Sequence, residues 1–221
     1  MGNIDAESKK YMSDNARFAD AFNYFIYDGK HVVDPKALSP LDPTEIVVPY
    51  GNETRVPVQK YRDVLKLWRA MTDGKNIYAV LGSENQANVH YAMPVKNGLY
   101  DFMNYAKQVE EAKKSYQHQN KDQEKVRLTS AEFLSGFRKD DRLIPVITLA
   151  IYFGVSDWDG PMSIHEMLNT KDEQLLQFLP DYRINLIAPA LMREEDFPKF
   201  STGVKYQAEM YKKSEIKMYN S

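Results

Sequence analysis

Cysteine is absent from the 221-residue chain, which excludes disulfides and thiolate metal sites. No apolar run approaches the ~18 residues of a membrane-spanning helix, and the N-terminal stretch "MGNIDAESKK" lacks the apolar core of a signal peptide. Neither sign of charge dominates, because 29 Lys and Arg stand against 31 Asp and Glu. Any affinity for nucleic acid must therefore come from local patches. These absences lead us to expect a cytoplasmic protein without a membrane partner.

Length and composition are those of one globular domain. Apolar residues make up 43% and charged residues 27%, so a chain of this length can bury a substantial core. We expect a domain over residues 1–200 and a Lys-rich helical tail over 201–221. The stretch "MSDNARFADAFNYFIYDGK" predicts the first helix, with Ser13 or Asp14 as its N-cap and Gly29 at its end.

Strand and helix patterns alternate along the rest of the chain. "TEIVVPYG" and "YRINLIAPA" are short strand candidates, and "LIPVITLAIYFG" is typical of a strand buried on both faces. "MPVKNGLYDFMNYAKQVEEAKKSYQHQ" is the longest helical pattern, "SIHEMLN" begins another helix, and an exposed loop is expected over 115–129. On the long helix we expect one apolar face made of Leu99, Phe102, Met103, Ala106 and Val109. This alternation predicts an α/β architecture.

The segment "VQKYRDVLKLWRAM" allows two interpretations. Tyr61, Leu65 and Trp68 fit the apolar stripe of a helix. The Asp73-Gly74 pair that follows is a turn signal between two apolar runs, which favours a hairpin with an extended segment on each side.

A pair of carboxylates meets if the hairpin forms. "GSENQAN", residues 82–88, follows the apolar run "IYAVL", and side chains 84 and 86 of a strand point to the same face. If the neighbouring strand starts near Asp63, that residue lies beside Glu84. Carboxylate oxygens suit Mg²⁺ or Mn²⁺ better than Zn²⁺, and Gln86 is placed to orient a bound water. On spacing alone, a strand end with a solvated turn remains the alternative interpretation.

Several separated motifs resemble one family. "KYRDVLKL" and "LGSENQANVHYAMPVKNGLYDFMNYAKQVEE" are similar to the active-site region of the Rpn recombination-promoting nucleases, a family also classed with transposases within the PD-(D/E)XK nuclease superfamily. That region has an Asp, a strand with Glu-x-Gln and a helix led by Met-Pro. "EFLSGFRKDDRLIPVITLAIYFGVSDWDGPMSIHEML" is similar to the second hallmark, a strand leading to Tyr-x-Gly, Trp and Gly-Pro. The resemblance runs from about Asp14 to about Phe200.

The resemblance implies a fold and a metal site. The implied fold is a three-layer α/β/α core of the restriction-endonuclease-like type, built around a mixed sheet. Asp63 and Glu84 are implied as ligands of Mg²⁺ or Mn²⁺. Gln86 stands where the superfamily usually has a lysine.

Further site residues follow from the same resemblance. Asp20 in "ADAFN" takes the place of the acidic residue of the family's early helix and is a further catalytic candidate. Asn23 stands in that helix's lysine position. Lys96, after the Met-Pro pair, stands where the family often has arginine, and we expect Lys96 and Asn85 to contact the substrate.

The implied function is a metal-dependent endonuclease that hydrolyses phosphodiester bonds of double-stranded DNA in recombination or mobile elements, with a homodimer as the candidate assembly. Basic residues gather in 113–142 and 199–221, where they form either phosphate contacts or solvated faces. Two alternatives stay open. One is a catalytically silent module that keeps the fold and binds DNA or a partner, and the other is a remnant of a mobile element with no current role.

Overall fold

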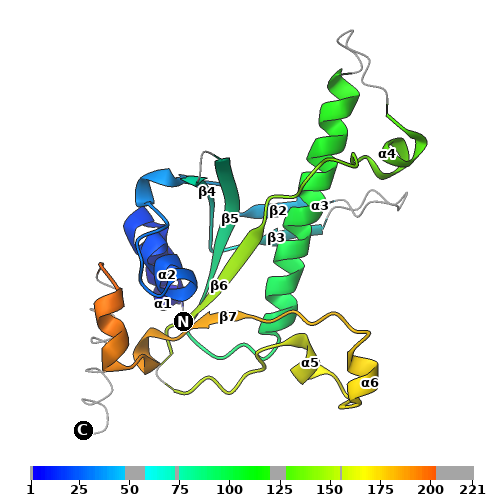
Figure 1. Cartoon of the computed structure of the whole chain (residues 1–221). Helices are drawn as coiled ribbons and strands as arrows, with labels where there is room; N and C mark the ends of the chain where they lie inside the picture. The colour runs from blue at the N-terminus through cyan, green and yellow to red at the C-terminus, as the bar shows by residue number, and fades with distance from the viewer. Residues whose placement is uncertain (1, 48–57, 73–74, 120–127, 155, 203–221) are drawn as a thin grey trace, which may run out of the picture.

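The computed structural model describes residues 2–47, 58–72, 75–119, 128–154 and 156–202. Its centre is a five-stranded sheet in the order β1-β4-β5-β6-β7, and β2 and β3 pair separately (Figure 1). The strands are β1 (Leu38–Pro40), β2 (Thr44–Val47), β3 (Val58–Tyr61), β4 (Val64–Thr72), β5 (Lys75–Gln86), β6 (Val146–Tyr152) and β7 (Asn185–Ile187). The α-helices are α1 (Gly2–Ser13), α2 (Asn15–Tyr27), α3 (Met93–Gln119), α4 (Ser130–Ser135), α5 (Ile164–Met167) and α6 (Glu173–Leu176). Short 3₁₀ helices are η1 (Pro35–Ala37), η2 (Pro189–Leu191) and η3 (Glu194–Lys199). The predicted α/β class is confirmed.

The central sheet is mixed. β1, β4 and β5 pair antiparallel, whereas β5, β6 and β7 run parallel. The parallel pair β5 and β6 needs a crossover connection, and the long helix α3 lies in that connection. The bounds of α3 match the predicted helical pattern at both ends.

β4 and β5 form a hairpin, which decides between the two interpretations of "VQKYRDVLKLWRAM". Val64 pairs with Ser83 and Thr72 pairs with Lys75, while the predicted turn at 73–74 lies outside the described residues. The helix interpretation of residues 61–68 is wrong. The apolar spacing misled because both faces of the sheet are covered, so that Leu65 and Trp68 pack into different apolar clusters although they share one strand.

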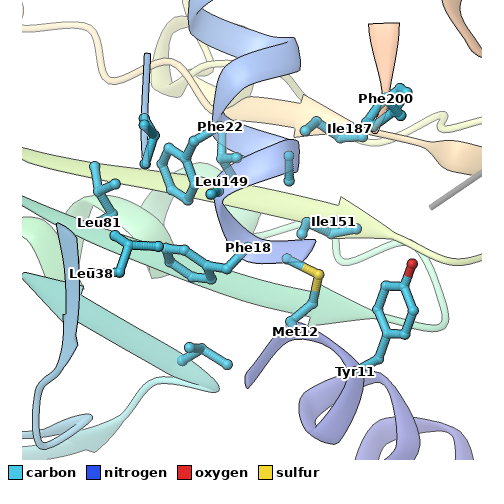
Figure 2. Close-up of a cluster of buried hydrophobic side chains, with 14 of the residues drawn as sticks. Tyr11, Met12, Phe18, Phe22, Leu38, Leu81, Leu149, Ile151, Ile187 and Phe200 are labelled. Atoms are coloured by element: carbon cyan, nitrogen blue, oxygen red, sulfur yellow. The ribbon is translucent and has the colours of Figure 1, made fainter. Parts of the chain in front are cut away.

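Helices cover both faces of the sheet, with α1 and α2 on one side and α3 on the other (Figure 1). The larger core lies on the α1 and α2 side, where Phe18 and Phe22 of α2 pack with Leu81, Leu149 and Ile151 of the sheet (Figure 2). On the α3 side, Val80 and Val146 pack near Tyr105. Successive residues of β5 and β6 therefore face opposite layers, as strand geometry requires.

The first predicted helix begins and ends at polar residues. Asp14 is the N-cap of α2 and accepts a hydrogen bond from the backbone N of Arg17 at 3.0 Å, which confirms one of the two predicted caps. Ser13 is instead the last residue of α1, a helix that the sequence pattern did not predict. α2 ends at Tyr27, and its C-cap is Asp28, whose φ of 51° is left-handed, one residue before the predicted Gly29.

The long helix α3 buries only part of the predicted apolar face. Met103 is buried, whereas Leu99 and Phe102 are 41% and 65% exposed. Polar residues of the helix, Asn97, Asp101 and Asn104, are buried as well. The sheet beneath α3 carries the buried polar side chain of Thr148 and is crossed by that of Arg62, so the buried side of the helix includes polar residues. That is why apolar spacing alone did not identify the buried face.

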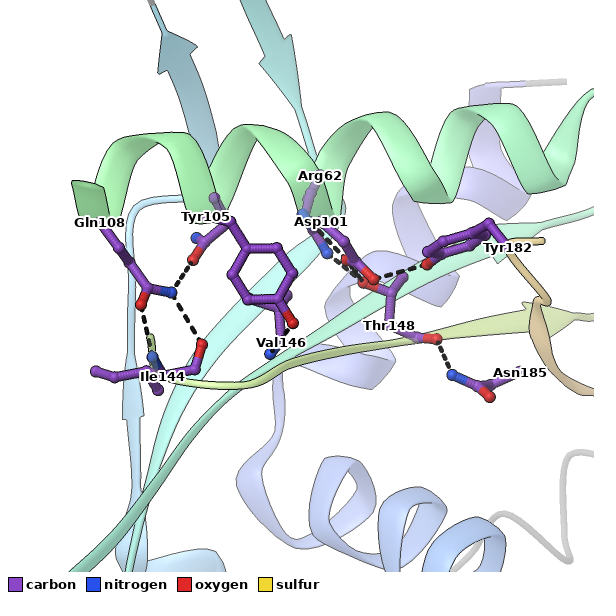
Figure 3. Close-up of polar contacts among 10 residues, drawn as sticks. Arg62, Asp101, Tyr105, Gln108, Ile144, Val146, Thr148, Tyr182 and Asn185 are labelled. Carbon is purple, nitrogen blue, oxygen red and sulfur yellow. Dashed lines mark hydrogen bonds and ion pairs between the residues drawn. The ribbon is translucent and has the colours of Figure 1, made fainter. Parts of the chain in front are cut away.

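A buried polar network joins α3 to the sheet (Figure 3). Arg62, whose side chain is 0% exposed, donates to Asp101 Oδ1 at 2.9 Å and to Thr148 Oγ1. Thr148 and Tyr182 donate to the two oxygens of Asp101, each at 2.6 Å. Four segments, namely the chain before β4, α3, β6 and the chain before β7, therefore meet at one carboxylate. Burial and the charge of Asp101 raise the pKa of Tyr182, which keeps its hydroxyl protonated as the donor.

Gly82 makes room for this network. A Cβ atom at position 82 would lie 2.6 Å from Nη1 of Arg62 and 3.3 Å from Oγ1 of Thr148. The glycine in "GSENQAN" thus lets the guanidinium lie across β5, where Gly82 pairs with Thr148 of β6.

The remaining expectations concern loops and the tail. α3 continues to Gln119, so the loop predicted from residue 115 starts later, and 120–127 lie outside the described residues. Residues from 203 onward, most of the predicted tail, also lie outside them. Within the described ranges, no helix is both long and apolar enough to cross a membrane.

Asp101→Asn should destabilise the protein strongly. The amide keeps the shape but removes the charge that pairs with the buried Arg62, and breaking a buried ion pair costs about 3–5 kcal/mol. The free energy of unfolding from urea titration measures the effect. The matched control Asp140→Asn changes an exposed carboxylate and should stay within about 0.5 kcal/mol of wild type. Equal effects of the two substitutions would show that the charge on Asp101 is not structural.

The other buried cation of the sheet is Lys66 on β4, which faces α1 and α2. It is 2% exposed, and its Nζ donates to the backbone O of Ser13 and to Oδ1 of Asn15, each at 2.6 Å. The Nζ also lies 4.8 Å from the ring centroid of Phe18. Burial lowers the pKa of Lys66 to about 8, against an effect of Asp14 in the opposite direction.

This buried ammonium predicts a pH dependence of stability. Between pH 8 and the ordinary lysine range, the folded protein loses the Lys66 proton while the unfolded chain keeps it, so stability rises with pH. Relative to Lys66→Met, the wild type should gain about 1–2 kcal/mol between pH 7 and pH 10. Urea titrations of both proteins across this range measure the difference. A constant difference would mean that Lys66 titrates as an exposed lysine does.

Candidate functional site

The hairpin brings three of the predicted site residues to one end of the sheet. Asp63 directly precedes β4, and Glu84 and Gln86 lie at the end of β5. Lys96 lies in the first turns of α3, the helix that begins seven residues after β5. The site is therefore built where the hairpin and the crossover helix meet.

Glu84 is the buried centre of this group. Its side chain is 2% exposed, and Oε2 lies 2.8 Å from Nζ of Lys96, whose side chain is 28% exposed. Alternation along β5 directs Glu84 toward α3, and the ion pair with a residue of that helix agrees with this direction. The second oxygen, Oε1, is buried and has no hydrogen-bond partner among the described residues. One oxygen of a buried carboxylate is thus paired and the other is left for a further ligand.

Asp63 reaches across to the same strand. Its Oδ2 accepts a hydrogen bond from the backbone N of Asn85 at 2.7 Å, which fixes the carboxylate beside the Glu84 position. Burial raises the pKa of Glu84, the charge on Asp63 raises it further, and Lys96 and Arg62 oppose the rise. The charge of Asp63 thus disfavours the charged form of Glu84, and a cation at this place would offset that effect.

Tyr100 and Arg62 complete the surroundings, and sequence reasoning missed both. Tyr100 lies one turn after Lys96 on α3 and is 6% exposed, with the Arg62 guanidinium 5.1 Å from its ring centroid. Burial raises the pKa of Tyr100 to about 12, and the charges of Glu84 and Asp63 add to this effect. The spacing of four residues from Lys96 was the available signal for Tyr100. For Arg62 the signal was its place next to Asp63.

The other two residues of the Glu-x-Gln strand point to different sides. Gln86 is half-buried and lies on the same face of β5 as Glu84. Asn85 lies on the opposite face, toward α1 and α2, and is 6% exposed. Neither Nδ2 nor Oδ1 of Asn85 has a hydrogen-bond partner in the part of the chain that the structure describes. The backbone of Asn85, rather than its side chain, takes part in the arrangement around Glu84.

The early-helix residues have structural partners elsewhere. Asp20, 2% exposed, accepts four hydrogen bonds of 2.6–3.0 Å from the backbone N and the hydroxyl of Ser201 and of Thr202. The Asn23 amide bonds the backbone of Val32 and Val33. The structure thus uses Asp20 to hold the segment after η3, and it does not bring the carboxylate to Lys96 or Glu84 through any of these contacts.

The donor set fits a hard cation that keeps much of its own hydration. The described residues contain no group of three or more His, Cys, Asp or Glu side chains that could hold a metal ion. The ligands expected from the sequence, Asp63 and Glu84, are only two carboxylates. Mg²⁺ is commonly bound through one or two carboxylates and keeps several of its own waters. This pair of residues offers two carboxylates, and Oε1 of Glu84 has no other partner among the described residues. The pair is a poor match for Zn²⁺, which takes nitrogen and sulfur ligands in a closed tetrahedral site.

Comparison of the chain with family models, with curated proteins and with solved structures gave no match. Function must therefore be argued from the side chains of this site.

The ion pair of Glu84 with Lys96 predicts a measurable coupling. In a double-mutant cycle with Glu84→Gln and Lys96→Met, we expect a coupling of about 1–2 kcal/mol, because the carboxylate is buried while the ammonium is partly exposed. The exposed pair of Glu110 with Lys114, at 3.9 Å, is the matched control and should couple by about 0.3–0.5 kcal/mol. Urea titration of the variants measures both. A coupling at Glu84 no larger than the control would contradict a buried pair.

Proposed function

We propose that this protein is a metal-dependent endonuclease that hydrolyses phosphodiester bonds of double-stranded DNA. The observation that carries the proposal is the buried Glu84, which has one unpartnered oxygen, lies in the electrostatic range of Asp63 and contacts Lys96 at 2.8 Å. This combination of two carboxylates with a flexible cation is what hydrolysis of a charged phosphodiester requires. The sequence resemblance to the Rpn family and its restriction-endonuclease-like core supports the same proposal.

Each residue of the site has a task in this reaction. Asp63 and Glu84 would hold Mg²⁺ or Mn²⁺, which would lower the pKa of a bound water and offset the negative charge of the phosphate. Gln86, on the same face as Glu84, orients the attacking water by hydrogen bonding. As the water oxygen bonds to phosphorus and gives up one proton to solvent, the bond from phosphorus to the leaving oxygen breaks, and that oxygen takes up one proton from solvent.

Lys96 supplies the positive charge that Gln86 lacks. An amide can orient water but cannot attract the negative charge that grows on the phosphate oxygens. The Nζ of Lys96 is at hydrogen-bond distance from Glu84, and the side chain is exposed enough to reach a phosphate at the same place. We therefore assign the superfamily's cationic task to Lys96 of the helix rather than to position 86 of the strand.

Cleavage of supercoiled plasmid tests the proposal. The wild type should nick DNA with Mg²⁺ and not with EDTA, and Glu84→Gln should lower the rate by at least about 10²-fold. Glu111→Gln, an exposed position on the same chain, is the matched control and should keep full activity. A preparation of Glu84→Gln that cuts as fast as the wild type would assign the cleavage to a contaminant.

The division of work between Gln86 and Lys96 can be measured separately. Lys96→Met and Gln86→Leu should each lower the rate by about 10²-fold at saturating Mg²⁺, since each removes one contact made to the reacting groups. Gln86→Lys should retain activity, because an ammonium can replace the amide contact. Lys171→Met, at an exposed position, is the control. Full activity of Lys96→Met would refute the assignment of the cation.

A silent DNA-binding or partner-binding module is the rival function, and one observation favours it. Lys96 already neutralises Glu84, and Asp63 is engaged with the backbone of Asn85, so the carboxylates have partners without any metal. Calorimetric titration of Mn²⁺ into the wild type and Asp63→Asn separates the two functions. Heat of binding that disappears in Asp63→Asn supports the nuclease, and the absence of heat from both supports the silent module.

A further inference from the structure

A second charged feature lies on the other side of the hairpin, around Lys66. The ammonium is buried and is bonded to two uncharged acceptors, the backbone O of Ser13 and the side chain of Asn15. No carboxylate among the described residues forms an ion pair with it. Asp14, whose charge acts on Lys66, accepts a hydrogen bond from the backbone of Arg17 instead. Two of the three N–H groups of this ammonium donate hydrogen bonds, and the third remains for a further acceptor. A buried charge without a full counter-charge lowers the stability of the folded protein.

The residues around this ammonium line an open cavity. The cavity has a volume of about 380 Å³, and Ser13, Asn15 and Lys66 all line it. Lys9 of α1 adds a second, exposed cation to the lining, and Asp63 lies in the lining as well. The remaining lining consists of Pro40, Leu41, Pro43, Val64 and Leu65. The cavity is thus cationic at Lys9 and Lys66 and apolar along Pro40, Leu41 and Pro43 and at the start of β4.

We propose that this cavity is a phosphate-binding subsite, in which Lys66 and Lys9 pair with the anion. An anion in the cavity supplies the counter-charge that Lys66 lacks inside the protein. Two amines match a phosphate group, which accepts hydrogen bonds through several oxygens at once. The Asn15 amide is not a donor to it, because its Nδ2 donates to the backbone O of Pro35 and of Leu38. The carboxylate of Asp63 in the same lining opposes an anion, but its Oδ2 is engaged with the backbone N of Asn85.

Two sources can provide the phosphate group. Because Asp63 belongs both to this lining and to the proposed catalytic site, a neighbouring phosphate of the same DNA strand is one source, and this part rests on the proposed function. Free inorganic phosphate is the other. The subsite itself does not depend on cleavage, so it can be tested without metal and without DNA.

Calorimetry with inorganic phosphate at pH 7 in metal-free buffer tests the subsite. We expect saturable binding to the wild type, at least a tenfold weaker affinity for Lys66→Met, and a smaller loss for Lys9→Glu. Lys36→Met, at an exposed position away from the cavity lining, is the matched control and should bind as the wild type does. Circular dichroism establishes that each variant is folded. If Lys66→Met does not fold, the exposed rim variant Lys9→Glu alone decides the outcome.

Equal affinity in the wild type, Lys66→Met and Lys9→Glu, or no binding to the wild type, would overturn the proposal. Anisotropy with a DNA duplex in EDTA then separates the two sources. If the subsite takes a backbone phosphate, Lys66→Met weakens DNA binding and reduces the slope of log affinity against log salt by about one. If it takes free phosphate, DNA binding stays unchanged while phosphate binding is lost. Either of these two results supports the phosphate-binding subsite. Both are independent of the cleavage test, so they would stand even if Glu84→Gln cleaved DNA as fast as the wild type.

Discussion

The buried guanidinium of Arg62 is the constraint on which the rest of the structure depends. It lies under α3, bonds Asp101 and Thr148, and occupies space that only a glycine at position 82 leaves open. A charge in this place must be fully paired, since an unpaired buried charge destabilises a protein by several kcal/mol. The pairing fixes the distance between the start of β4, the middle of β6 and the third turn of α3. Because Asp63 is the next residue in the chain and Lys96 lies on the same helix as Asp101, the network also sets the spacing of the candidate site.

The site itself combines features that oppose one another. Burial and Asp63 favour a protonated Glu84, whereas Lys96 and Arg62 favour the carboxylate. A balance of this kind is typical of functional sites, where ionisable groups are held away from water and given few partners. It also allows a stable resting state, because the ion pair with Lys96 neutralises Glu84 in the absence of other ligands. The same arrangement therefore serves a nuclease at rest and a silent module equally well, and only the response to a divalent cation distinguishes them.

The hairpin of β4 and β5 is charged on both of its faces. The proposed catalytic site and the proposed phosphate subsite are therefore both built on this hairpin. Glu84 and Lys96 lie on the α3 face, and Lys66 lies on the face of α1 and α2, with Asp63 between them at the start of β4. Under the proposed function, a nucleic-acid strand that met this edge would find positive charge on either side of a carboxylate pair. Such a local distribution would stand in for the overall positive charge that the chain lacks.

The sequence by itself determined the features that depend on neighbours along the chain. The cap at Asp14, the bounds of α3 and the buried strand β6 all follow from local spacing and capping residues. The hairpin that sets Asp63 beside Glu84 was one of two interpretations of the sequence, and the structure decided between them. Only the tertiary structure decided which face α3 buries, since Leu99 and Phe102 of its apolar stripe are exposed and Asp101 pairs with Arg62 and Thr148. It also decided the partner of Lys96 and the use of Asp20 to hold Ser201 and Thr202, about 180 residues away along the chain. The physical reason is that periodicity reports whether a side chain is apolar, whereas a buried polar side chain is specified by a partner from a distant segment.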